Sequence, residues 1–308
     1  MSSMVQLTGL SHRFGDFTAL DDLSFQVAPG ELFGIVGPDG AGKTTALRIL
    51  AGILRPTAGD ATVAGISVRQ DPEGVKHRIA YMSQRFGLYG DLTVRENIDF
   101  YATLYQVPKA DRKQRLDRLY QFSRLGPFAG RLAAKLSGGM KQKLSLCCAL
   151  IHEPEVLLLD EPTFGVDPIS RRDLWLIVHE MVANGMTAIV STAYLDEAER
   201  CDRVALLQKG RLAGLDRPAV LQNALASRAI AIETDQPRLA ATLLRNHALV
   251  RSAAAFGGEL HVTTAVEGAA TAIEHFLRES GMQITAVRPL VPSLEDVFID
   301  LTSVAHAA

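Results

Sequence analysis

The chain has 308 residues, of which 47% are hydrophobic and 21% are charged, and its formal net charge is −2. This composition is that of an ordinary folded protein and argues against a disordered chain. The small net charge provides no general attraction to nucleic acid, so we expect no nucleic-acid partner. The length suits one large domain and a smaller second one.

The sequence also bears on location. Its longest apolar runs, such as VLLLD at 156–160, are far shorter than the roughly 20 residues that a membrane-spanning helix needs. The amino-terminal sequence MSSMVQLTGLSHRFG lacks the basic and then apolar layout of a secretory signal. We therefore expect a soluble, cytoplasmic protein that reaches a membrane only through a partner. The cysteines Cys147, Cys148 and Cys201 form no C-x-x-C pair, and we expect them to be reduced and buried.

The predicted elements follow a simple order. Residues 4–36 alternate in the manner of β-strands, and short apolar strands then alternate with helical stretches, which predicts an α/β core with mainly parallel strands. Residues 91–145 are helical in pattern, so we expect a helical subdomain inserted into that core. After residue 225 the order is strand, helix, two strands, helix and strand, the layout of a small α+β, ferredoxin-like module. The predicted domains are residues 1–222 and 225–308.

A phosphate-binding loop is predicted after the third strand. GPDGAGKTT at 37–45 matches G-x-x-x-x-G-K-[ST] between an apolar strand and a helix. Gly40 and Gly42 let backbone N–H groups point at phosphate oxygens, and the helix starting near Lys43 adds its positive end. Lys43 carries a charge for the β- and γ-phosphates, and the Thr44 hydroxyl is placed to bind Mg²⁺. The predicted nucleotide-binding loop comprises Gly37, Pro38, Asp39, Gly40, Ala41, Gly42, Lys43, Thr44 and Thr45.

Two further motifs suggest more of the same site. In LSGGMKQKL at 136–144, Ser137 is a good helix N-cap, and the amides of Gly138 and Gly139 are available to a second anion. The apolar strand VLLLD at 156–160 is followed by Glu161, and we expect that strand to be buried between helices. Asp160 would then emerge beside the phosphate loop and hold Mg²⁺. The adjacent Glu161 would polarise an attacking water as the catalytic base.

In this order, the motifs resemble those of the nucleotide-binding subunits of ABC transporters, over residues 4 to about 222. GPDGAGKTT resembles the Walker A loop, LSGGM the signature motif and VLLLDE the Walker B motif. The resemblance implies that Phe14 stacks on adenine, that Gln84 lies in the Q-loop beside the metal, and that Asp167 lies in the D-loop. The segments ENIDFYATLY and SLEDVFIDLT are similar in sequence to the ABC-2-type multidrug-export branch of the family. Residues 225–308 would then form the accessory domain of that branch.

The resemblance further implies ATP and Mg²⁺ as cofactors and two kinds of partner. Two ATPase domains would face each other head to tail, and each ATP would lie between the phosphate loop of one domain and Ser137, Gly138 and Gly139 of the other. A separate membrane permease would receive the resulting motion, through a surface near residues 84–105. The chain would then lie peripherally on the cytoplasmic face of the plasma membrane.

One position departs from the family pattern. Where the family usually has histidine in the H-loop, VSTAYLDEAE places Ala193. A methyl group neither donates nor accepts a hydrogen bond, and the loss of one positioned donor commonly costs about 10²–10³ in rate. The chain would therefore pair with a second, more complete ATPase, or form a homodimer that hydrolyses ATP slowly with Glu161 alone. A regulatory subunit without turnover and a soluble ABC ATPase that acts on ribosomes or DNA are the rival functions.

Overall fold

The structure is a computed structural model that describes residues 3–84 and 87–304. Contacts divide the chain into two compact units. Unit 1 comprises Met1–Ala193 and Lys209–Leu212, and unit 2 comprises Tyr194–Gln208 and Ala213–Ala308. Residues 194–208 thus group with the C-terminal residues by contact, whereas the sequence assigned them to the first domain. The domain boundary near residues 222–225 stays a prediction.

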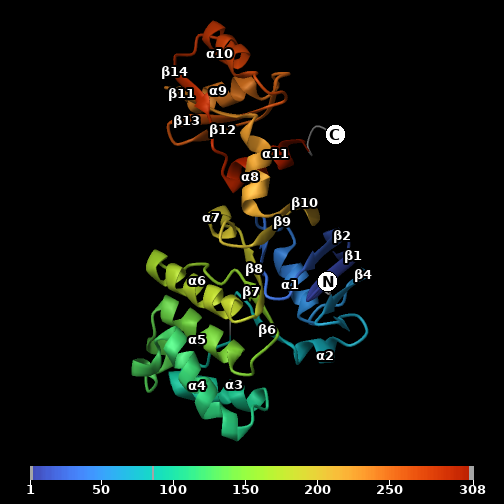
Figure 1. The fold of residues 1–308 in the computed structure, drawn as a ribbon, viewed down its shortest axis with the longest axis vertical. Coiled ribbons are helices and arrows are strands. Elements are labelled where there is room, and N and C mark those ends of the chain that lie inside the picture. The colour runs from blue at the N-terminus through green and yellow to red at the C-terminus, as the bar shows by residue number, and fades with distance from the viewer. Residues whose placement is uncertain (1–2, 85–86, 305–308) are drawn as a thin grey trace. The chain divides into compact units, whose positions relative to one another are not determined.

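Unit 1 combines two sets of strands with helices (Figure 1). Its elements in chain order are β1 (Val5–Phe14), β2 (Phe17–Val27), β3 (Leu32–Val36), α1 (Lys43–Leu50), β4 (Ala58–Val63), β5 (Ile66–Ser67), α2 (Pro72–Lys76), β6 (Ile79–Met82), α3 (Val94–Leu104), α4 (Lys109–Ser123), the 3₁₀ helices η1 (Gly126–Phe128) and η2 (Ala133–Lys135), α5 (Gly138–Leu150), β7 (Val156–Asp160), α6 (Pro168–Ala183) and β8 (Thr187–Thr192). Strands β2, β1, β4 and β5 form an antiparallel sheet in that order.

The core of unit 1 is a set of parallel strands. β6 pairs with β7, β7 with β8, and β8 with β3, all in parallel. Every residue of β3, β7 and β8 is buried. An apolar run such as VLLLD in β7 is what a parallel strand requires when helices cover both faces of its sheet. The predicted α/β class is confirmed.

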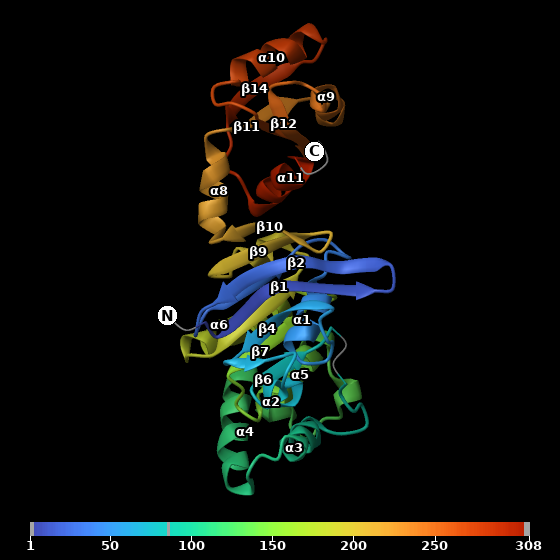
Figure 2. The ribbon, with the colours of Figure 1, turned by 90° about the vertical axis from the view of Figure 1, so that its right-hand side faces the viewer.

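The helical insertion is also present. Helices α3, α4 and α5 lie together at one end of unit 1 (Figures 1 and 2), and both α3 and α4 contact α5. Thr93 begins α3 with a capping box, because its side chain accepts from the Glu96 N–H and the Glu96 carboxylate accepts from the Thr93 N–H. Within residues 3–84 and 87–304, no helix has both the length and the apolar character needed to cross a membrane.

Unit 2 contains the predicted ferredoxin-like module. Its elements are α7 (Leu195–Ala198), β9 (Arg203–Gln208), β10 (Arg211–Asp216, which starts in unit 1), α8 (Pro218–Ala226), β11 (Ala229–Thr234), α9 (Pro237–Leu244), β12 (Val250–Phe256), β13 (Glu259–Thr264), α10 (Ala270–Glu279), β14 (Ile284–Pro289) and α11 (Leu294–Val304). The antiparallel sheet has the order β12-β13-β11-β14. Helices α9 and α10 bury Leu244 and Ile273 in one core with Ile232 and Leu260 of the sheet.

The final helix of unit 2 is tied to the sheet by charge. Asp296 of α11 lies 2.7 Å from His261 Nδ1 on β13, and Asp300 lies 2.9 Å from Arg251 on β12. Burial raises the pKa of Asp300, and the positive charge of Arg251 opposes that shift. The segment SLEDVFIDLT is therefore a helix that packs on the module.

The two glycines at the start of α5 differ in the space around them. A methyl group at Gly139 would lie 2.0 Å from Ser170 Oγ and 2.2 Å from Ser170 Cβ, whereas one at Gly138 would meet nothing within 4 Å. We expect Gly139→Ala to lower the free energy of unfolding by about 1–3 kcal/mol, because Ser170 belongs to α6 and must shift. Gly138→Ala should change it by less than about 0.5 kcal/mol. Thermal unfolding of the two variants measures the difference.

A rescue variant tests the cause. Ser170→Gly removes both clashing atoms, so the pair Gly139→Ala and Ser170→Gly should be less destabilising together than the sum of the two single changes. Equal melting temperatures for Gly138→Ala and Gly139→Ala would show that α5 and α6 are not packed this closely.

Candidate nucleotide-binding site

The candidate site lies where the parallel strands of unit 1 end. Val36, the last residue of β3, is level with Thr192 of β8, and Asp160 of β7 is level with Ser191. The phosphate loop follows β3, and Gln84 follows β6 by two residues. Ligands of open α/β sheets bind outside the carboxyl ends of the strands. Segments that are far apart in the sequence therefore meet at one edge.

The phosphate loop has the backbone expected of an anion cradle. Gly40 and Gly42 have φ angles of 78° and 103°, in the left-handed region that glycine tolerates. A Cβ at Gly42 would lie 2.6 Å from the Ala19 carbonyl oxygen, so a larger residue does not fit there. Helix α1 begins at Lys43 without a side-chain cap, which leaves its first N–H groups for a ligand. These features suit a polyphosphate.

Lys43 is buried in this loop, with 4% of its surface exposed. Its Nζ donates to the carbonyl oxygens of Gly37 at 2.8 Å and Pro38 at 3.2 Å, and it lies 3.1 Å from Glu161 Oε1. A buried ammonium requires such partners. A phosphate that binds this lysine has to compete with the carboxylate of Glu161.

Asp160 is 2% exposed and accepts three hydroxyl hydrogen bonds. Its Oδ1 accepts from Thr44 Oγ1 at 3.0 Å and from Ser191 Oγ at 2.7 Å, and its Oδ2 accepts from the Tyr81 hydroxyl at 3.1 Å. Carboxylate and hydroxyl oxygens are the ligands that Mg²⁺ prefers, so Asp160 and Thr44 together fit a magnesium ion.

Tyr81 and Ser191 are functional candidates that the sequence motifs did not identify. In the strand register, Ser191 of β8 lies opposite Asp160 of β7. Tyr81 of β6 lies opposite Leu158, which is two residues before Asp160 in β7. Both residues lie on strands that neighbour the VLLLD strand, and this position is what identifies them. The sequence does not show which residues of neighbouring strands pair, so it could not reveal that they meet Asp160. Burial and, next, the charge of Asp160 raise the pKa of Tyr81 to about 12, so its hydroxyl stays protonated.

Glu161 follows Asp160 in an unusual backbone conformation. Its φ is 48°, a left-handed value that costs free energy for a residue other than glycine. The backbone N–H of Glu161 donates to both Ser191 O at 3.1 Å and Ser191 Oγ at 3.0 Å, which holds this turn in place. The carboxylate lies between two partners, with Lys43 at Oε1 and Gln84 Nε2 donating to Oε2 at 3.0 Å.

The other predicted site residues lie on separate elements. Phe14 ends β1 and is 48% exposed, with its ring edge against His12. Ser137 caps α5, and Asp167 caps α6 by accepting from the Ser170 N–H at 2.9 Å, a bond that lowers the pKa of Asp167. In the described part of the chain, no hydrogen bond or ion pair joins Phe14, Ser137, Gly138, Gly139 or Asp167 to Asp160 or Glu161. One chain thus assembles only part of the predicted site.

Position 193 carries an exposed methyl group directly after β8. Two histidines of unit 1, His152 and His179, lie in other elements and do not take its place. His152 lies beside the Ile79 carbonyl, at the opposite end of β6, and stacks on Tyr105. His179 lies in α6 beside Trp175.

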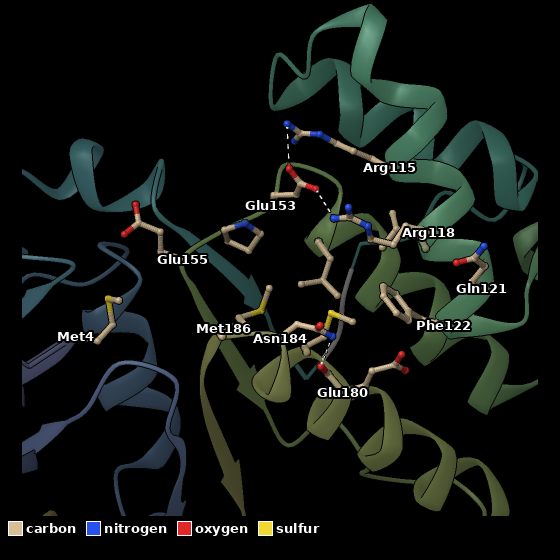
Figure 3. Close-up of a pocket in the computed structure, with 15 residues that line it drawn as sticks. Met4, Arg115, Arg118, Gln121, Phe122, Glu153, Glu155, Glu180, Asn184 and Met186 are labelled. Carbon is tan, nitrogen blue, oxygen red and sulfur yellow. Dashed lines mark hydrogen bonds and ion pairs between the residues drawn. The ribbon is translucent and has the colours of Figure 1, made fainter.

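A cavity of about 740 Å³ lies elsewhere in unit 1 (Figure 3). Its lining comes from α4 and from the segments that precede β7 and β8, which places it at the amino ends of these strands. Arg115 and Arg118 on α4 both pair with Glu153, at 3.2 and 2.9 Å. None of the motif residues predicted from the sequence belongs to its lining.

Known proteins share these features. Residues 20–164 match the family model described as ABC transporter. The chain is 44% identical over 303 residues to the probable multidrug ABC transporter ATP-binding protein YbhF of Escherichia coli K12, covering 97% of this chain and 52% of that protein. It is 35% identical to the Nod factor export ATP-binding protein I of Rhizobium leguminosarum bv. viciae, covering 97% and 94% of the two chains.

A solved structure agrees with these relatives. An ATP-binding subunit of an ABC transporter superposes with a TM-score of 0.66 at 30% identity, covering 72% of this chain and 93% of that one. The chain spans about half the length of YbhF and nearly all of the Nod factor protein. It therefore belongs to the ATP-binding proteins of the ABC transporter family, in the ABC-2-type export branch that its motifs resemble.

Proposed function

We propose that this chain binds Mg-ATP at the carboxyl-end edge of unit 1 and hydrolyses it to drive export through a separate membrane permease. The observation that carries this proposal is a network of contacts at this edge. Lys43 and Gln84 both contact the Glu161 carboxylate, and Thr44 donates to Asp160. The Ser191 hydroxyl links the two groups, since it donates to Asp160 and accepts from the Glu161 N–H. Proteins of this family bind ATP and Mg²⁺. The names of the relatives refer to multidrug and Nod factor export, and they support the proposal that ATP hydrolysis drives export.

Each residue then has a role. The loop amides and Lys43 bind the phosphates, Phe14 offers an exposed ring for base stacking, and Thr44 and Asp160, with Gln84 nearby, hold Mg²⁺. When bound, the ion neutralises charge on the β- and γ-phosphates. The residues assigned to nucleotide binding are Phe14, Gly37, Pro38, Asp39, Gly40, Ala41, Gly42, Lys43, Thr44, Thr45 and Gln84, and in the partner's site Ser137, Gly138, Gly139 and Asp167.

Glu161 is the proposed catalytic base. In the structure its carboxylate is shared by Lys43 and Gln84. A γ-phosphate that attracts Lys43 leaves Oε1 of Glu161 without its cation, so this oxygen becomes free to accept a proton from the attacking water. Nucleotide binding and activation of the base are thereby linked through one lysine.

A dimer is proposed because, among the described residues, no hydrogen bond or ion pair joins the signature loop to Asp160 or Glu161 of the same chain. The start of α5 is fixed to α6, since Gly139 lies against Ser170 and Lys143 Nζ lies 2.8 Å from Asp173. Two apolar side chains beside the Asp167 turn, Phe164 and Ile169, are exposed. Exposed apolar groups of this kind suit a protein partner.

The partner ATPase is a homologous chain or a second copy. Ala193 favours pairing with a more complete ATPase, whose site this chain's LSGGM would complete. The alternative is a homodimer that turns over slowly. A regulatory half-site that binds ATP without hydrolysis is the second candidate function, and Ala193 is the observation that favours it.

The permease is proposed to dock near residues 84–105, of which 85–86 lie outside the described residues. Tyr89, Phe100, Leu104 and Tyr105 are exposed there, and the rings of Tyr89 and Phe100 lie 4.7 Å apart. A cluster of exposed aromatic and apolar side chains is typical of a protein-binding surface. This contact would hold the chain peripherally on the cytoplasmic face of the membrane.

Ala193→His tests the missing imidazole. If the site is otherwise well formed, the added donor should raise kcat by about tenfold or more, in the direction opposite to the loss seen when such donors are removed. Phosphate release by the purified protein measures this change. Glu161→Gln in both backgrounds is the control and should abolish turnover. A wild-type rate that Glu161→Gln leaves intact would place hydrolysis outside this site.

The Glu161→Gln variant should also form a dimer in saturating Mg-ATP. Two anion-binding helix ends then bind the same triphosphate from two chains, and no hydrolysis releases them. Size-exclusion chromatography with light scattering reports the mass. Adding Lys43→Ala should return the variant to monomer. A variant that stays monomeric, both alone and with candidate partner ATPases, contradicts the proposed arrangement.

Permease docking can be tested at Leu104, which is 58% exposed. Leu104→Asp should reduce co-purification with a co-expressed candidate permease by about tenfold, because a buried carboxylate at such an interface lacks a partner. Leu176→Asp is the matched control, since Leu176 is 59% exposed but lies on α6. Equal recovery of permease with both variants would exclude this surface.

A further inference from the structure

We propose that Tyr81 is a positioning residue for the magnesium site, because its hydroxyl fixes the orientation of the Asp160 carboxylate. The inference rests on the proposed function, in which Asp160 holds Mg²⁺. It concerns a residue that belongs to no phosphate-loop, signature or Walker motif of this chain. Tyr81 lies on β6, the strand next to β7.

Strand geometry explains why a tyrosine performs this task. Tyr81 pairs with Leu158, which lies two residues before Asp160 on β7. Alternate residues of a strand face the same side, and two residues span about 6.6 Å. The side chain at position 81 therefore has to extend along the sheet to contact the Asp160 carboxylate. The phenol of tyrosine is long enough for this, whereas the hydroxyl of serine or threonine is not. Ser191 pairs with Asp160 directly, so its short hydroxyl is sufficient.

The three hydroxyl donors occupy most of the lone-pair directions of the Asp160 carboxylate. A carboxylate oxygen has about two lone-pair directions. Oδ1 already accepts from Thr44 and Ser191, whereas Tyr81 is the one donor to Oδ2 among the described residues. One direction on Oδ2 therefore remains for the ion or its bound water, and the Tyr81 bond decides where that direction points. Thr44 would keep donating its proton to Oδ1, so the lone pairs of its own oxygen would stay available to the ion.

Without Tyr81 the carboxylate would lose this restraint. The terminal torsion of aspartate is soft, so hydrogen bonds rather than rotamer preference set its orientation. The phenol has a single O–H group, and in the structure it donates to Asp160 Oδ2 at 3.1 Å. Outer partners of metal-binding carboxylates typically affect metal affinity 10–100-fold.

The test measures metal binding rather than turnover. Titrating the full chain with Mn²⁺ in the presence of ATP, followed by electron paramagnetic resonance, should show the half-saturating Mn²⁺ concentration of Tyr81→Phe raised by about tenfold. Binding of a fluorescent ATP analogue in EDTA should be unchanged, because Tyr81 does not belong to the phosphate loop. Tyr120→Phe is the control, since it removes the hydroxyl of a tyrosine on α4, outside the proposed site, and should leave both values as in wild type.

A second variant separates the hydrogen bond from the ring. Tyr81→4-aminophenylalanine keeps both the ring and a donor, so it should recover most of the Mn²⁺ affinity. Wild-type affinity in Tyr81→Phe, or equal loss of nucleotide binding in EDTA, would overturn the positioning role and leave the proposed function standing. A wild-type chain that binds no Mn²⁺ with ATP would overturn the proposed function, and this inference with it.

Discussion

Parallel pairing of β3, β8, β7 and β6 is the constraint on which the candidate site depends. Because these strands run in the same direction, their carboxyl ends reach one edge, and the side chains that follow them meet there. Lys43 follows β3, Asp160 and Glu161 end or follow β7, and Ser191 belongs to β8. A shift of β7 by one residue would turn Asp160 to the opposite face of the sheet and separate it from Thr44.

Two adjacent carboxylates receive different environments at this edge. Asp160 remains in the strand and meets neutral hydroxyl donors on both oxygens. Glu161 turns away through a left-handed backbone conformation and meets the charge of Lys43 and the amide of Gln84. The first arrangement suits a carboxylate that holds a cation in a fixed direction. The second suits one whose charge partner can be exchanged for a phosphate, which is the behaviour proposed for the base.

The rest of the predicted machinery is organised by helix starts. Ser137 caps α5 and Asp167 caps α6, and the two helices are joined by Lys143 with Asp173 and by the close approach of Gly139 to Ser170. The Asp167 turn and the signature loop of the same chain are therefore held together by contacts between their helices. In the proposed dimer this connection would link the two nucleotide sites, independently of whether the loop at Ala193 supports fast hydrolysis.

The sequence by itself determined the class of fold, and it supplied most of the residues proposed to bind nucleotide, because both depend on local patterns. The phosphate loop is written in consecutive residues, the helix caps are set by neighbouring side chains, and the alternation of apolar segments identifies the strands and the C-terminal module. Tyr81, the pairing of Lys43 with Glu161, and the bond from Gln84 to Glu161 were decided only by the tertiary structure. They join residues 77 to 118 positions apart, and their contact depends on strand order and register, which packing of the buried strands selects and local sequence does not encode.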